Sequence, residues 1–146
     1  MSDFSPSKEF SDFFFLAIDH GFDSIEGGGG PLVPFTMVVE PSGKKQLTRF
    51  VTNRLEDGVE KAKSSITPSQ GLSMYAIAWD GFVTLEGRKW DAILVEAGES
   101  SDEFGVLFSQ RYVRRRKRFL QKPRCERVGN LALIGRPHSR LRAVDA

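Results

Sequence analysis

The stretch MYAIAWDGFVTLEGRKWDAILVEAG, residues 74–98, alternates apolar runs with two turn signals that contain glycine. Asp80-Gly81 and Gly87-Arg88 separate the runs, and Asp-Gly is a strong hairpin signal because a type I′ turn needs positive φ at both central positions. Tight hairpins join antiparallel neighbours. The stretch therefore predicts an antiparallel meander with strands near residues 73–79, 82–86 and 89–97.

Before this stretch the sequence predicts one helix and two strands. The helix is expected to begin in SPSKEF, where Ser5 would cap it and Pro6 would stand at its first position, and to end near Gly21. Two apolar runs then predict strands near residues 33–40 and 45–52, joined by a turn.

A second helix is expected from Asn53, which has the spacing of a capping box with Glu56, to Thr67-Pro68, which ends it. After the meander the pattern predicts strands near residues 104–113 and 130–135. This order predicts an α+β domain, with two helices and a mostly antiparallel sheet of about six strands. We expect one compact domain over residues 1–135 and a frayed tail over residues 136–146.

The composition places the chain among ordinary globular domains. It has 146 residues, of which 40% are hydrophobic, and one cysteine, Cys125. The longest apolar run has six residues, from Phe13 to Ile18, which is too short to span a membrane, and the acidic N-terminal stretch lacks the cationic start of a signal peptide. We therefore expect a cytoplasmic protein without membrane association. Because Cys125 is the single cysteine, no intramolecular disulfide can form.

The first helix has an unusually wide apolar side. At about 100° per residue its phenylalanines cover an arc of roughly 200°, about twice what one packed layer needs. The acidic residues Glu9, Asp12, Asp19 and Asp23 share the opposite side. The surplus predicts burial between two layers or a contact with another chain. The predicted interface residues are Phe10, Phe13, Phe14, Phe15, Ile18 and Phe22.

The segment RYVRRRKRF, residues 111–119, carries six positive charges, and residues 111–146 carry twelve Lys and Arg against two acids. At strand spacing, alternate residues from Phe104 to Tyr112 face the core, but beyond Val113 both faces are cationic and cannot be buried. The predicted contact residues are Arg111, Arg114, Arg115, Arg116, Lys117, Arg118, Lys122 and Arg124.

Three interpretations of this basic segment stay open. The charge forms a solvated patch that prevents edge-to-edge sheet pairing, or it meets the acidic side of the first helix within the chain or across a dimer. In the third interpretation, residues 111–127 bind the phosphate backbone of nucleic acid, with Tyr112 and Phe119 as stacking surfaces.

Catalytic signals are weak. His20 lies beside Asp19 and one turn from Asp23, a grouping that could orient a base or supply metal ligands, with Asp23 the better placed partner. The glycines of EGGGGP, residues 26–31, lack the Lys-Ser/Thr pair and the following helix of a phosphate loop, so they predict a connector. His138 falls in the expected tail.

Taken together, the sequence predicts a non-catalytic, intracellular interaction module that needs no cofactor or metal. It is expected to act through self-association or a protein partner, with nucleic-acid binding as the alternative. An enzyme or metal site around His20 is the less favoured reading.

Overall fold

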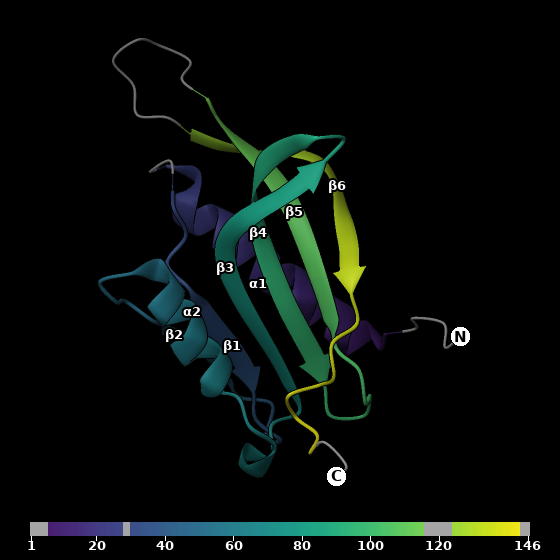
Figure 1. Cartoon of the computed structure of the whole chain (residues 1–146). Coiled ribbons are helices and arrows are strands. Elements are labelled where there is room, and N and C mark those ends of the chain that lie inside the picture. Colours follow the sequence, from purple (N-terminus) through teal and green to yellow (C-terminus); the bar gives the residue numbers. More distant parts are fainter. Residues whose placement is uncertain (1–5, 28–29, 116–123, 144–146) are drawn as a thin grey trace.

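The computed structural model describes residues 6–27, 30–115 and 124–143. The elements in chain order are α1 (Lys8–Glu26), β1 (Phe35–Val39), β2 (Lys45–Arg49), α2 (Leu55–Ser64), a 3₁₀ helix (Pro68–Gln70), β3 (Met74–Leu85), β4 (Arg88–Glu99), β5 (Val106–Arg115) and β6 (Arg124–Gly135). The strands form one sheet in the order β2-β1-β3-β4-β5-β6, in which all neighbours are antiparallel (Figure 1). The predicted α+β class, with two α-helices and six strands, is confirmed.

The hairpin predicted at Asp80-Gly81 is wrong. β3 continues through both residues, with Asp80 opposite Ile93 and Gly81 opposite Ala92. The chain instead reverses after Leu85, where Glu86 and Gly87 have φ of 53° and 75°. Gly81 serves packing rather than a turn, because a Cβ on it would lie 2.5 Å from Leu94 Cδ1. A long, curved β3–β4 hairpin results (Figure 1).

α1 lies across one face of this sheet (Figure 1). Its N-cap is Ser7, whose hydroxyl accepts a hydrogen bond from the Phe10 amide, whereas the predicted cap, Ser5, lies outside the described residues. The helix continues through Gly21 and ends at Glu26. Gly21 packs close to the sheet: a Cβ added to it would lie 3.6 Å from Ile93 Cδ1 and 3.6 Å from Leu32 Cδ2. The glycine therefore brings the helix near the sheet instead of ending the helix.

α2 lies on the opposite face, over β1 and β3 (Figure 1). A second core forms there from Ala62, Ile66, Leu72, Tyr75, Ile77 and Leu141. The capping box predicted at Asn53 is absent: Arg54 is the N-cap and its side chain makes no capping hydrogen bond. A capping box instead opens the 3₁₀ helix, between Thr67 and Gln70.

The C-terminal residues that we expected to fray make contacts as far as Arg142. Phe104 and His138 form an isolated antiparallel bridge, and Arg136 Nε donates to the Gly105 carbonyl at 2.7 Å. Strand β6 is also twice as long as the six residues predicted at 130–135, because it pairs with β5 from Arg124 onward. None of the described helices is both long and apolar enough to cross a membrane.

Candidate functional site

The phenylalanine side of α1 belongs to the protein's own core. Of the predicted interface residues, Phe10, Phe13, Phe14, Ile18 and Phe22 are buried, and Phe15 alone is exposed, by 52%. The same core takes side chains from β1, β3, β4, β5 and β6, so the curved sheet covers a wider arc of the helix than a flat layer could. This burial supports the first of the two interpretations of the wide arc, in which the helix is covered within its own domain.

The basic segment is divided between the two faces of the sheet. As predicted, Val106, Phe108 and Tyr112 face the core under α1. Arg114 Nη1 contacts Asp91 at 2.8 Å, and Arg127 Nη2 contacts Asp19 on α1 at 2.9 Å. One of the three open interpretations was a contact between the basic segment and the acidic side of α1, and among the described residues the Arg127–Asp19 ion pair is of that kind.

The face opposite α1 gathers the remaining described cations of the segment. Arg111 and Arg115 alternate along β5, and Arg115 lies directly opposite Arg124 of β6. The guanidinium carbons of Arg111 and Arg88 lie 4.8 and 3.7 Å from the ring centroid of Trp90. We call these five residues, Arg88, Trp90, Arg111, Arg115 and Arg124, the arginine face.

Carboxylates neutralise little of the arginine face. Arg115 Nε contacts Glu126 at 3.1 Å, but within the described residues Arg88, Arg111 and Arg124 have no ion-pair partner. The other predicted contact residues, Arg116, Lys117, Arg118 and Lys122, lie outside the described residues, as does Phe119.

A hydrogen-bonded cluster joins β3, β5 and the residues before β1 on the α1 side. The Asp80 carboxylate accepts hydrogen bonds from the Leu32 amide at 2.7 Å and from the Tyr112 hydroxyl at 2.8 Å. Burial raises the pKa of Asp80, and burial together with the Asp80 hydrogen bond raises the pKa of Tyr112. The cluster fixes the end of the glycine connector, whose Gly28 and Gly29 lie outside the described residues.

Cys125 lies beside this cluster and is buried. Burial raises the pKa of its thiol, and Arg114 opposes that shift. A thiol with a raised pKa is mostly protonated at neutral pH and is a poor nucleophile. Cys125 is therefore a packing residue, contributed by β6 to the core that α1 covers.

His20 contacts a cation rather than the predicted acids. Its Nε2 lies 3.2 Å from Arg49 Nη2, and its ring meets Phe35 edge-on at 5.0 Å between centroids. Asp19 is engaged by Arg127 instead. Across the described ranges no three His, Cys, Asp or Glu side chains come together in a group that could hold a metal ion.

We expect His20 to make stability depend on pH. Burial, then the charge of Arg49, lowers its pKa below the usual 6.5. The folded state therefore disfavours the imidazolium, so the contribution of His20 is complete above pH 6.5 and is lost as pH falls through the lowered pKa. Between pH 7.5 and 5.5, urea unfolding should show a larger loss of stability in the wild type than in His20→Gln. Equal losses would contradict this.

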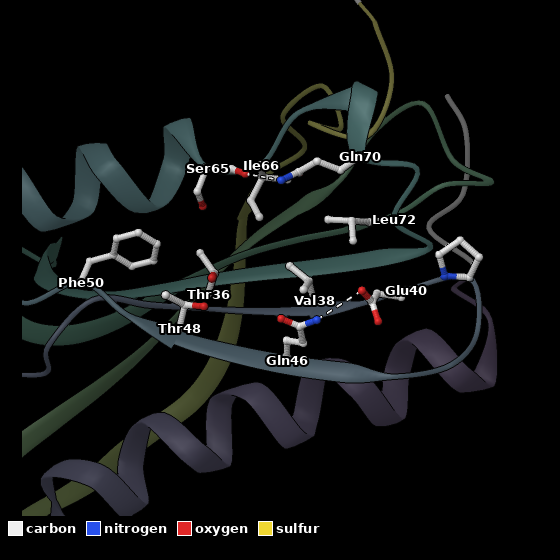
Figure 2. A pocket seen from close by; sticks show the side chains of 11 residues that line it. Thr36, Val38, Glu40, Gln46, Thr48, Phe50, Ser65, Ile66, Gln70 and Leu72 are labelled. Atoms are coloured by element: carbon white, nitrogen blue, oxygen red, sulfur yellow. Dashed lines mark hydrogen bonds between the residues drawn. The ribbon is translucent and has the colours of Figure 1, made fainter.

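Sequence reasoning missed a groove of about 640 Å³ on the α2 side of β1 and β2 (Figure 2). Thr36 and Val38 of β1 and Gln46 and Thr48 of β2 form its floor, and the residues after α2 form one wall. Its members are far apart in sequence and carry no motif. The available signal was the alternation of Thr36 with Met37 and of Thr48 with Leu47. If both apolar side chains face the core, both threonines lie on the other face of the sheet.

Comparisons with known proteins give no relative for this chain: no family model, no curated protein and no solved structure matches it.

Proposed function

We propose that the protein binds single-stranded nucleic acid through the arginine face. One observation carries the proposal: Arg115 of β5 stands directly opposite Arg124 of β6. Like charges at directly opposed positions destabilise a strand pair, and the Glu126 carboxylate contacts Arg115 alone, so an anion lying over both side chains would relieve the remaining repulsion. A phosphate group supplies that anion.

The surroundings of Trp90 support a phosphate ligand. A guanidinium that lies over an aromatic ring still has its N–H groups at its edge, where they are free to donate to two oxygens of one phosphate. Arg88 and Arg111 both lie over the Trp90 ring, and neither is neutralised by a carboxylate in the described part of the chain. These two side chains extend the cationic track from β5 to β4.

Self-association through α1, our first expectation, has lost most of the side chains that motivated it, because five of the six are buried in the core. The phosphate proposal uses side chains that are accessible in the single chain. It also gives a role to the charge of the basic segment, which the core cannot accept.

The test is fluorescence anisotropy with a labelled mixed-sequence RNA single strand, measured from 50 to 200 mM salt. Affinity should fall steeply with salt, because each neutralised phosphate contributes about 0.7 to the log–log slope for single strands. Replacing Arg111, Arg115 and Arg124 together by glutamine should reduce that slope by about 2.

The matched control replaces Lys44, Lys45 and Arg54 by glutamine, which makes the same change in net charge away from the arginine face. Equal weakening by both triple variants, or no RNA binding at 50 mM salt, would overturn the proposal. Binding to vesicles that contain phosphatidylserine, without binding to RNA, would assign the same cations to an anionic lipid surface and would also overturn it.

A further inference from the structure

The groove over β1 and β2 contains two hydroxyl groups without partners. Thr36 and Thr48 are directly opposed across the β1–β2 pair, and neither side chain has a hydrogen bond in the described part of the chain. The Thr36 residue is only 4% exposed. Among the described residues, every fully buried side-chain oxygen has a hydrogen-bond partner, so the partnerless Thr36 hydroxyl is not one of the fully buried atoms. Its hydroxyl therefore reaches the groove. Burying polar groups at such a site is costly unless they find partners.

The far end of the groove carries a carboxylate paired with a carboxamide. Gln46 Nε2 donates to Glu40 Oε1 at 3.2 Å, and both side chains line the groove (Figure 2). A carboxylate has about four acceptor positions and a carboxamide offers both donors and acceptors, so this pair keeps unused capacity of both kinds. Adjacent hydroxyl groups on a ligand match that capacity, because each hydroxyl both donates and accepts.

The walls are apolar or already hydrogen-bonded. Gln70 is committed to the backbone: its Nε2 donates to the Ser65 carbonyl at 2.8 Å and its Oε1 accepts from the Thr67 amide at 2.9 Å. Phe50, Ile66 and Leu72 supply apolar surface around the polar floor (Figure 2). An anionic ligand would find no counter-charge, since the lining contains no Lys, Arg or His.

We propose that this groove binds a neutral sugar. Sugar rings combine hydroxyl groups that both donate and accept with C–H faces that pack on apolar and aromatic side chains, and the groove offers both surfaces. Its volume lies within the range of about 300–1,000 Å³ typical of small-molecule sites. This site is separate from the arginine face and does not depend on the function proposed for it.

The test is a titration of ¹⁵N-labelled full-length protein with maltose, sucrose and methyl β-galactoside, followed by amide chemical shifts. At least one sugar should shift the amides of Thr36, Gln46 and Thr48. In the double variant Thr36→Val, Thr48→Val the affinity should fall about tenfold or more, because both hydroxyl hydrogen bonds to the sugar are lost while the side-chain shape is kept.

Thr84→Val is the matched control, since Thr84 is exposed on β3 and does not line the groove. It should leave the affinity unchanged. If the double variant fails to fold, Gln46→Ala on the exposed side of β2 serves in its place, with the same expected loss. No shift with any of the three sugars, unchanged affinity in the folded groove variant, or shifts produced by adenosine alone would each overturn the proposal.

Discussion

Replacing Phe13 by alanine is expected to lower the free energy of unfolding by about 3–5 kcal/mol, the cost usual for deleting a buried phenylalanine. Phe13 is 2% exposed and lies in the core between α1 and the sheet. The substitution removes a ring from that core and leaves a cavity that the neighbouring side chains cannot fill. Urea denaturation at neutral pH measures the change.

Phe15→Ala is the control on the same helix. Phe15 is 52% exposed, so its replacement should change the free energy of unfolding by less than about 1 kcal/mol. If both substitutions cost little in stability and both abolished an oligomer detected by sedimentation, α1 would be an interface and not a core element. That result would restore the interpretation that the wide apolar arc first suggested.

The wide apolar arc of α1 shows what a local pattern can and cannot predict. The spacing of Phe10, Phe13, Phe14 and Phe22 correctly identified the buried side of a helix, because periodicity is a property of the element itself. How wide an arc the sheet covers depends on the curvature of β3 and β4, which a helix pattern does not contain. The surplus arc therefore left two interpretations open, burial within the domain or contact with another chain, and the sheet covers most of that arc.

Turn chemistry failed in a related way. Asp80-Gly81 and Glu86-Gly87 both contain a glycine between apolar runs, and each could be a two-residue hairpin loop. The structure uses the second, while Asp80 remains in β3 and accepts hydrogen bonds from Leu32 and Tyr112. Those partners are 48 and 32 residues away, so no local signal could separate the two sites.

Both candidate sites depend on strand register. The sequence identified Arg111, Arg115 and Arg124 as charged residues, but only the β5–β6 register places Arg115 opposite Arg124. Likewise, Thr36 and Thr48 become one pair of hydroxyls through the β1–β2 register. Charge density can be predicted from composition, whereas the geometry of a binding surface needs the strand register.

The contact that holds the C-terminal residues against the sheet is expected to contribute strongly to the free energy of unfolding. Arg140 Nε contacts Glu96 Oε2 at 2.7 Å, and the Tyr75 hydroxyl donates to the same oxygen at 2.8 Å. The Glu96 side chain is 7% exposed and the Arg140 side chain 32%. Removing one partner of a buried ion pair usually costs about 3–5 kcal/mol, because the other charge is left buried and uncompensated.

Arg140→Ala should therefore destabilise the protein by about 2 kcal/mol, a value reduced because water already screens the partly exposed guanidinium. Arg142→Ala, on the same segment, should change stability by less than about 0.5 kcal/mol, since Arg142 is exposed and makes no ion pair in the described residues.

The charge explanation for Arg140 can be separated from loss of packing with a double variant. Glu96→Gln removes the buried charge and keeps the shape of the side chain, so adding it to Arg140→Ala should recover part of the lost stability. Urea denaturation of the four proteins in this cycle gives the coupling energy between residues 96 and 140. If the double variant were less stable than Arg140→Ala by the full cost of Glu96→Gln alone, the two side chains would act independently. Arg140 would then hold the C-terminal residues on the sheet through its aliphatic stem and its hydrogen bond to the Lys63 carbonyl, and not through the ion pair with Glu96.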